Sequence, residues 1–210
     1  MLTAVVPRIF VVDDNPSVRK SLTRLLTSAG YAVEAFASAR DFLIREPSEG
    51  PCCLLLDVRM PGLTGIELQE ALAATGRRVA IVFVTGHADV PISVKAMKGG
   101  AIDLLTKPVD QEELLAAISR AVAKDAEDRS GAARLAEIRQ RVRTLTAREA
   151  EVFALVVTGM LNKQIAYELG IGEKTIKVHR ARVMEKMRAG SVAELVRLAD
   201  AVGVLVASAR

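Results

Sequence analysis

The sequence predicts a doubly wound α/β domain built on a five-stranded parallel sheet, followed by an all-α domain of four helices that contains a helix-turn-helix. Two observations lead to this fold class. Between residues 8 and 122, short apolar runs alternate five times with segments whose apolar residues recur at helical spacing, which is the pattern of a parallel sheet covered by helices. After residue 144 only the helical spacing remains, and basic residues concentrate in one helical segment.

The expected strands of the first domain are short and end at polar residues or turn formers. The third, Cys-Cys-Leu-Leu-Leu, is apolar throughout and stops at Asp57 before a Pro-Gly turn, so we expect it to be buried on both faces. Glycines such as Gly30 and Gly76 mark the ends of the intervening helices. We expect strands at 8–12, 31–35, 52–56, 79–84 and 102–105, and helices at 17–29, 37–44, 66–74, 90–97 and 112–122.

The formal net charge of +4 comes entirely from the second part of the chain. Residues 1–124 hold 14 Lys+Arg and 14 Asp+Glu, which leaves 15 basic and 11 acidic residues after residue 124. This asymmetry indicates a basic, partner-binding second domain. Since Trp is absent and aromatic residues make up only 3% of the chain, a stacking platform for single-stranded nucleic acid is not expected.

We expect neither a signal peptide nor a membrane span. Residues 1–7 lack a basic start followed by an apolar core, and no uncharged apolar stretch approaches the roughly 18 residues that a span requires. Cys52 and Cys53 are neighbours on an expected strand, so their side chains point to opposite faces and do not chelate one metal ion together. Two buried, reduced cysteines fit a cytoplasmic protein.

Polar side chains follow four of the five expected strands. Because the carboxyl ends of parallel strands meet at one edge of a sheet, we expect these side chains to converge, with Asp57 as a phosphate acceptor. Three carboxylates close together repel one another and require a cation, and an all-oxygen cluster suits Mg²⁺. Taken singly, such residues are commonly turn formers, helix caps or solvated charges; five at matching strand ends favour a site. They are Asp13, Asp14, Asp57, Thr85 and Lys107.

Residues 8–124 resemble the receiver domain of two-component response regulators. The matching pieces are Val12-Asp13-Asp14, Asp57-Val58-Arg59-Met60-Pro61-Gly62, Phe83-Val84-Thr85-Gly86 and Thr106-Lys107-Pro108. The resemblance implies that a sensor histidine kinase phosphorylates Asp57 and that Thr85 and Lys107 contact the phosphate. It also implies a cis peptide bond between Lys107 and Pro108. The implied Mg²⁺ ligands are Asp13, Asp14, Asp57 and the backbone carbonyl of Arg59.

One position departs from the receiver pattern. The family usually has Tyr or Phe three residues before the site lysine, as a ring that turns inward on activation, and this chain has Leu104 there. The departure leaves phosphate acceptance intact. The switch then works either through a smaller side chain or through movement of Thr85 and displacement of a helix.

The domain boundaries follow from a change in composition after residue 124. We expect a first domain at 1–124, a helical linker at 125–143 and a second domain at 144–210. Charged residues run up to Ser130-Gly131, which interrupts this charged stretch and indicates that the first domain ends nearby. Helix formers resume at Ala132, with Leu135, Ile138 and Val142 on one side.

Four helices are expected after the linker. Thr146 and Glu149 form a capping-box pattern at the first, whose loss typically costs about 1 kcal/mol, and Asn162 is expected to cap the second. The third, 173–187, carries basic residues opposite an apolar side, and the fourth begins after Ser191 and extends its apolar side to Leu205. A single basic amphipathic helix is usually a solvated face, but a helix, tight turn and basic helix is the arrangement that enters the major groove of DNA.

Asn162 to Ile171, followed by Thr175 to Arg180, resembles the helix-turn-helix of LuxR, NarL and FixJ-type regulators over about 60 residues, and the whole domain order is similar to FixJ. The resemblance implies base contacts and phosphate contacts on double-stranded promoter DNA, with the last helix pairing two modules. Gly172 stands where the family commonly has Ser, a stronger N-cap. The implied DNA-binding residues are Lys163, Lys174, Thr175, Lys177, Val178, Arg180, Ala181 and Arg182.

The function expected from these patterns is a transcriptional response regulator that forms a homodimer when Asp57 is phosphorylated, with RNA polymerase as a further candidate partner. It is not expected to be a turnover enzyme, because haloacid-dehalogenase-like enzymes place an acid/base Asp two residues after the nucleophile and this chain has Arg59. The alternative is a DNA-binding regulator that acts independently of phosphorylation and uses the first domain as a dimerisation scaffold. The kinase, stimulus, operator and sign of regulation are not encoded in recognisable motifs.

Overall fold

The computed structural model describes residues 6–86 and 89–204. The chain forms two compact units, Met1–Arg129 and Ser130–Arg210. Each unit has its own apolar core. In the part of the chain that the structure describes, no helix combines the length and the apolar character that crossing a bilayer requires.

The first unit is built on a parallel five-stranded sheet in the order β2-β1-β3-β4-β5. Its register pairs Val12 with Leu56, Leu56 with Phe83, and Phe83 with Leu104, so the carboxyl ends of four strands lie in line. All five residues of β3 are buried, as its unbroken apolar sequence predicts. The strands are β1 (Arg8–Val12), β2 (Ala32–Phe36), β3 (Cys52–Leu56), β4 (Ala80–Thr85) and β5 (Asp103–Thr106).

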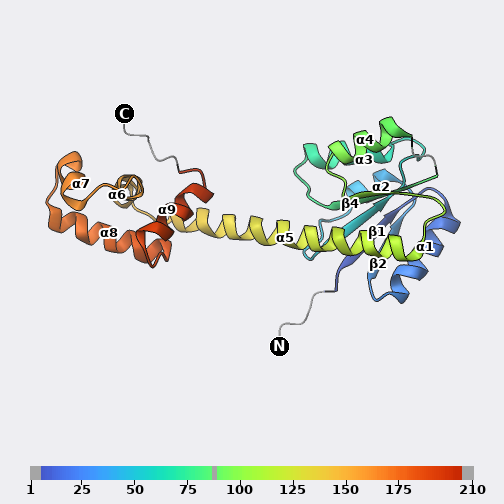
Figure 1. Cartoon of the computed structure of the whole chain (residues 1–210), viewed down its shortest axis with the longest axis horizontal. Helices are drawn as coiled ribbons and strands as arrows, with labels where there is room; N and C mark the ends of the chain where they lie inside the picture. The colour runs from blue at the N-terminus through green and yellow to red at the C-terminus, as the bar shows by residue number, and fades with distance from the viewer. Residues whose placement is uncertain (1–5, 87–88, 205–210) are drawn as a thin grey trace. The chain divides into compact units, whose positions relative to one another are not determined.

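Helices cover both faces of this sheet (Figure 1). One face, with Phe10, Leu54 and Phe83, packs against α2, α3 and α4. The opposite face packs against α1 and the first part of α5. The predicted doubly wound α/β fold is therefore confirmed, and most predicted element ends agree within one or two residues. The helices are α1 (Pro16–Ser28), α2 (Ala39–Ile44), α3 (Gly65–Ala74), α4 (Val90–Lys98) and α5 (Gln111–Arg143).

The helix expected at 112–122 and the helical linker expected at 125–143 form one continuous helix. Helix α5 continues from Gln111 to Arg143, although a glycine inside a helix costs roughly 1 kcal/mol relative to alanine. Packing on both sides of the glycine offsets this cost: Ile118 is buried in the core of the first unit and Ile138 in the core of the second. The first compact unit runs through Arg129, beyond the expected boundary at residue 124.

An ion pair fastens α5 to the start of β3 within the first unit. Asp125 is only 3% exposed, and its Oδ2 accepts hydrogen bonds from the Cys52 amide at 2.9 Å and from Arg129 Nε at 2.5 Å. Arg129 also donates to the Ser48 carbonyl at 2.9 Å. Buried charge is tolerated here because both partners are hydrogen-bonded.

The second unit, as far as residue 204, contains helices and no strand, as predicted. Its core includes Ile138 of α5 and the apolar sides of all four following helices. The Thr146–Glu149 capping box at the start of α6 is present, and Ser191 caps α9. Leu205, expected on the last apolar side, lies outside the described residues. The helices are α6 (Ala147–Val157), α7 (Asn162–Leu169), α8 (Glu173–Met187) and α9 (Val192–Ala201).

The expected capping role of Asn162 is wrong. Leu161 occupies the N-cap position of α7, and its amide donates to Gln164 Oε1 at 2.7 Å. Asn162 is the first helical residue, and its side-chain oxygen accepts instead from the Arg180 guanidinium at 2.9 Å. A tertiary partner on α8 therefore takes the oxygen that local capping would have used.

Replacement of Asp125 tests whether its hydrogen bonds to the Cys52 amide and Arg129 hold α5 against β3. Asp125→Ala is expected to lower the free energy of unfolding by about 1–3 kcal/mol, because the buried Cys52 amide loses its acceptor. Chemical denaturation of the full chain measures this loss. The control is Glu127→Ala, whose side chain is 79% exposed and whose removal is expected to cost less than about 0.5 kcal/mol. Equal losses in both variants would contradict this role of Asp125.

Candidate functional site

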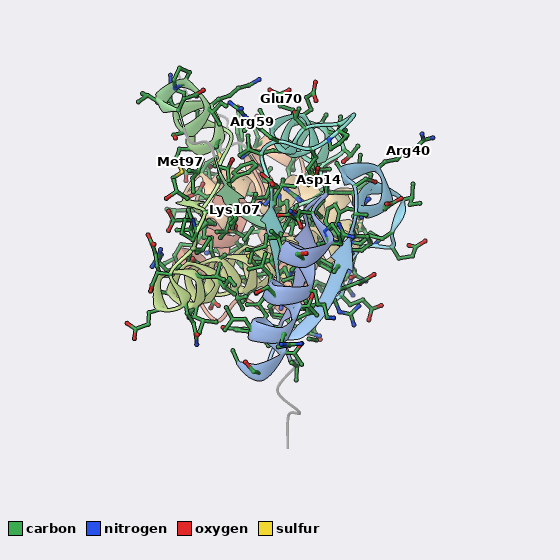
Figure 2. All side chains as sticks on the ribbon, turned by 90° about the vertical axis from the view of Figure 1, so that its right-hand side faces the viewer. Asp14, Arg40, Arg59, Glu70, Met97 and Lys107 are labelled. Carbon is green, nitrogen blue, oxygen red and sulfur yellow. The ribbon has the colours of Figure 1, made fainter. Side chains whose placement is uncertain are left out.

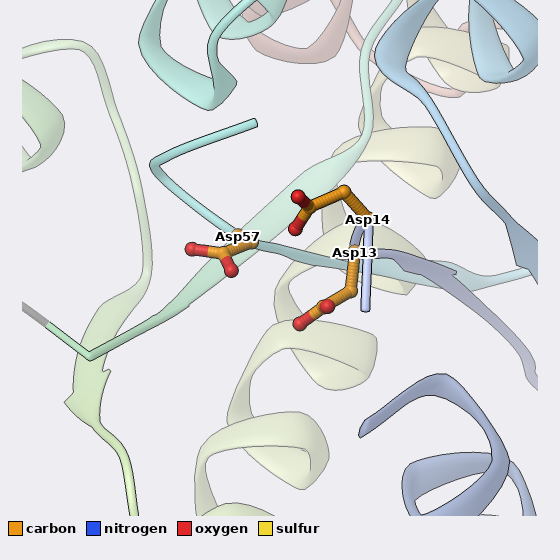
Figure 3. A group of neighbouring side chains, drawn as sticks. All are labelled: Asp13, Asp14 and Asp57. Carbon is orange, nitrogen blue, oxygen red and sulfur yellow. The ribbon is translucent and has the colours of Figure 1, made fainter. Parts of the chain in front are cut away.

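Three carboxylates gather at the carboxyl edge of the sheet. Each of Asp13, Asp14 and Asp57 places a carboxylate oxygen within 4.8 Å of the other two. Figure 3 shows the three side chains around a common space. Asp13 is 2% exposed and Asp57 8%, whereas Asp14 is exposed. The sequence prediction that these residues converge is confirmed.

The sheet and the start of α3 fix the position of Asp57. The Asp57 amide donates to the Val12 carbonyl at 2.9 Å, which ties the residue after β3 to the end of β1. Gly65 begins α3 directly over this turn: a Cβ atom at Gly65 would lie 2.2 Å from the Asp57 carbonyl oxygen. Glycine is therefore required sterically at Gly65, and α3 starts in contact with the Asp57 backbone.

Lys107 places its ammonium group between two of the carboxylates. Its Nζ atom lies 2.6 Å from Asp13 Oδ2 and 2.7 Å from Asp57 Oδ2. Burial by itself disfavours the charged amine, but the hydrogen bonds to Asp13 and Asp57 dominate and raise the pKa of Lys107 above its ordinary value. Figure 2 shows Lys107 and Asp14 in the central part of the view of the first unit. The site thus contains its own fixed positive charge.

Thr85 and Arg59 complete the edge. Thr85 ends β4, is 1% exposed, and accepts the Lys107 amide at its backbone carbonyl at 2.8 Å. The Lys107–Pro108 peptide bond is cis. The Arg59 amide donates to Asp57 Oδ1 at 3.2 Å while its side chain is exposed. Participation of the Arg59 carbonyl in metal binding stays a prediction.

The donor set suits a hard divalent cation. All three acidic ligands offer oxygen atoms, two are buried, and the third is open to solvent, which leaves room for water ligands. The cluster is therefore a candidate divalent-metal site. Asp57 is also hydrogen-bonded to Lys107, and an ammonium group beside a carboxylate can stabilise a phosphoryl group transferred to that carboxylate.

The predicted DNA-binding residues of the second unit lie on α7 and α8. Ile176, Val183 and Met187 are fully buried and turn one side of α8 into the core. The opposite side is open: Val178 is 46% exposed, and the basic residues around it are exposed as well. The exposed members of the predicted set are Lys163, Lys174, Thr175, Lys177, Val178, Ala181 and Arg182.

Arg180 differs from the other predicted contacts. It is half-buried and donates to Asn162 Oδ1, so it joins α8 to the start of α7. Sequence spacing placed Arg180 on a basic face but gave no signal for this partner 18 residues away. The structure thus gives Arg180 a role in fixing the angle between the two helices.

The sequence also contained no signal for a second contact between helices, the ion pair of Glu149 with Lys186. Glu149, only 2% exposed, accepts from Lys186 Nζ at 2.6 Å and from the Thr146 amide at 2.9 Å. Lys186 also donates to the Thr144 carbonyl at 3.0 Å. The last turn of α8 is therefore fastened to the start of α6. These bonds, from Lys186 first and then from Thr146, lower the pKa of Glu149 to about 2.

Family models match both units. Residues 9–119 match the response regulator receiver domain. Residues 143–199 match the bacterial regulatory proteins of the luxR family. Each matched segment contains the site residues described above for its unit.

Similar proteins cover nearly the whole chain. Nodulation protein W of Bradyrhizobium diazoefficiens is 45% identical over 93% of this chain and 86% of its own length. The transcriptional regulatory protein FixJ of Azorhizobium caulinodans is 43% identical over 93% of both chains. Among solved structures, the response regulator StyR is 47% identical with a TM-score of 0.84, over 93% of this chain and 99% of that chain. Full-length FixJ from B. japonicum is 42% identical with a TM-score of 0.55, over 94% and 98%.

The Glu149–Lys186 pair predicts a pH dependence of stability. Because the folded pKa of about 2 lies below the ordinary value of 4.5, the pair stabilises the folded chain above pH 4.5 and loses this effect as the pH falls toward 2. The difference in free energy of unfolding between wild type and Glu149→Gln should be constant above pH 4.5 and shrink below it. Denaturation at a series of pH values measures the difference; one that does not change with pH would contradict the pair.

Proposed function

Because the chain belongs to the response regulators that join a receiver domain to a LuxR-family DNA-binding domain, we propose that phosphorylation of Asp57 by a sensor histidine kinase controls its binding to promoter DNA. The observation that carries this proposal is the position of Asp57. Its carboxylate lies at the edge of the sheet, beside two further carboxylates and within 2.7 Å of Lys107. This arrangement suits an acceptor of a phosphoryl group rather than a turnover enzyme.

The transfer requires a nucleophile and compensation of negative charge. A carboxylate oxygen of Asp57 forms the bond to phosphorus as the bond to the donor imidazole nitrogen breaks. Lys107 already lies within hydrogen-bonding distance of Asp57, and its raised pKa keeps it positively charged. Together with Thr85, it would contact the phosphoryl oxygens.

Mg²⁺ is the proposed cofactor. Asp13, Asp14, Asp57 and the Arg59 carbonyl would hold the ion. When bound, it would neutralise the charge that these carboxylates and the incoming phosphate accumulate. The exposed Asp14 keeps one side of the cluster open to solvent.

The exposed side of α8 is the proposed reading surface for DNA in the major groove. Lys177, Val178 and Ala181 would face base edges. Around them, phosphate contacts would fix the orientation of the module without reading sequence. The proposed phosphate-contacting residues are Lys163, Lys174, Thr175, Arg180 and Arg182.

Phosphorylation is proposed to favour a homodimer that binds a two-fold related DNA site. Exposed apolar side chains on α4 support such an interface: Val90 is 77% exposed, and Val94 and Met97 are about half exposed. Helix α9 would pair the DNA-binding modules. RNA polymerase remains a proposed partner. The cytoplasm is the proposed location, which fits the free thiols of Cys52 and Cys53.

DNA binding with and without a phosphodonor tests the proposal. Acetyl phosphate should raise the affinity of the wild-type protein for its operator by about 5- to 150-fold, the usual range of allosteric coupling, and should leave Asp57→Asn unchanged. Glu49→Gln, which removes an exposed carboxylate, is the matched control and should respond like wild type. A titration of labelled promoter DNA measures the affinities.

Two outcomes of this titration would reject the proposal. An equal response of wild type and Asp57→Asn would remove Asp57 from the mechanism. Tight binding by all forms without any donor response would support the scaffold alternative, in which the receiver domain only promotes dimerisation.

Mg²⁺ binding is tested separately by thermal unfolding. A ligand present at 100 times its dissociation constant stabilises the folded state by about 2.7 kcal/mol, so Mg²⁺ should raise the unfolding midpoint of the wild-type protein. Asp14→Asn removes one proposed ligand and should need a higher Mg²⁺ concentration for the same rise. Asp41→Asn, an exposed aspartate on α2, should behave like wild type. Identical Mg²⁺ titrations for Asp14→Asn and wild type would exclude Asp14 as a ligand.

A further inference from the structure

Helix α3 touches the backbone of the proposed phosphoacceptor at its first residue. Gly65 packs against the Asp57 carbonyl so closely that no side chain fits, and the Gly65 amide donates to the Val58 carbonyl at 3.0 Å. Ile66, Leu68 and Leu72 then bury α3 against the sheet. A conformational change in the turn after Asp57 would therefore act on α3 by direct contact, without involving β5.

The same helix holds α4 through a buried side chain. Gln69 is 4% exposed, and its Nε2 donates to the Ala96 carbonyl at 3.0 Å. Ala96 is the one fully buried residue among those of α4, all of which the structure describes. The hydrogen bond from Gln69 therefore contacts α4 at its buried residue, where the helix packs against the rest of the domain. An exposed pair, Glu70 and Lys95 at 2.9 Å, lies beside it.

Gly99 makes this contact sterically possible. A Cβ atom there would lie 2.6 Å from Gln69 Oε1, so any larger residue would displace the amide. A cavity of about 310 Å³ borders Gln69, Gly99 and Gly100, so open space adjoins this contact. Elsewhere α4 is largely open: Val90 is 77% exposed, and Met97 lies at the periphery in Figure 2.

The contacts from Asp57 through α3 to α4 matter because this chain has Leu104 where receiver domains usually have an aromatic ring. Leu104 is half-buried against the same sheet face as Ala96 and Ile92 and has no ring to reorient. We propose that α3 relays the phosphorylation state of Asp57 to α4, with Gly65 receiving the change and the Gln69–Ala96 hydrogen bond passing it on. Gln69 is then a positioning residue of the switch. The inference rests on phosphorylation of Asp57.

Two variants break the relay without touching the site. Gln69→Leu keeps a side chain of similar size but removes the donor. The Ala96 carbonyl still accepts from the Ala101 amide at 3.2 Å, so no buried carbonyl is left unpaired. Gly99→Ala displaces the amide of Gln69 by contact instead. Gly131→Ala, at an open position of α5, is the control for replacing a glycine by alanine where no neighbouring side chain is displaced.

The experiment compares amide hydrogen exchange across Val90–Lys98 in the full-length proteins, before and after treatment with acetyl phosphate and Mg²⁺. Phosphate incorporation is measured by intact mass on the same samples. Phosphorylation should change exchange in α4 of wild type and Gly131→Ala. Gln69→Leu and Gly99→Ala should accept as much phosphate as wild type but lose most of that change.

The outcomes separate the relay from the proposed function. A full α4 response in both phosphorylated variants would overturn the relay, as would an α4 in wild type that does not respond to phosphorylation. Folded variants that fail to accept phosphate would place Gln69 in support of the site instead, which also overturns it. A wild-type protein that accepts no phosphate at all would reject the proposed function, and the relay with it.

Discussion

The first unit depends on keeping negatively charged groups close together at low exposure. Asp13 and Asp57 are almost fully buried, and a carboxylate is removed from water only at a large cost unless a partner compensates its charge. Lys107 supplies that partner by bonding to both at once. The remaining architecture serves this contact: β1, β3 and β5 end in line and bring three strand ends to one place. A phosphoryl group on Asp57 would add negative charge beside Lys107 and would therefore change the hydrogen bonds from Lys107 to Asp13 and Asp57.

Two other buried carboxylates, each hydrogen-bonded to a basic side chain, hold helices in position. Asp125 fastens α5 to β3 in the first unit. Glu149 fastens α8 to α6 in the second. Neither carboxylate belongs to the proposed chemistry. Both hold helices in position by buried hydrogen bonds, whereas α4 has a single buried residue.

Sequence patterns predicted the sheet and its helices, because apolar spacing is visible within each short segment. They also predicted that the site residues converge, because a parallel sheet brings the carboxyl ends of its strands to one edge. The errors and omissions have a common physical cause. Asn162 and Arg180 bond across 18 positions, and Gln69 bonds to Ala96 across 27, so local spacing holds no signal for either pair. The sequence also contained no signal that the last helix of the first domain and the helical linker are one helix, because the apolar residues on either side of Ser130-Gly131 pack into different cores.

The central claim is that Asp57 is a reversible input to a DNA-binding protein. Its most direct test is peptide mapping by mass spectrometry after incubation with a phosphohistidine-bearing donor domain, with Lys107→Ala measured in parallel. The account predicts one phosphoryl group on the peptide that contains Asp57, with slower incorporation in Lys107→Ala because the compensating charge is lost. Phosphate on another residue, or none in the folded wild-type protein, would contradict it.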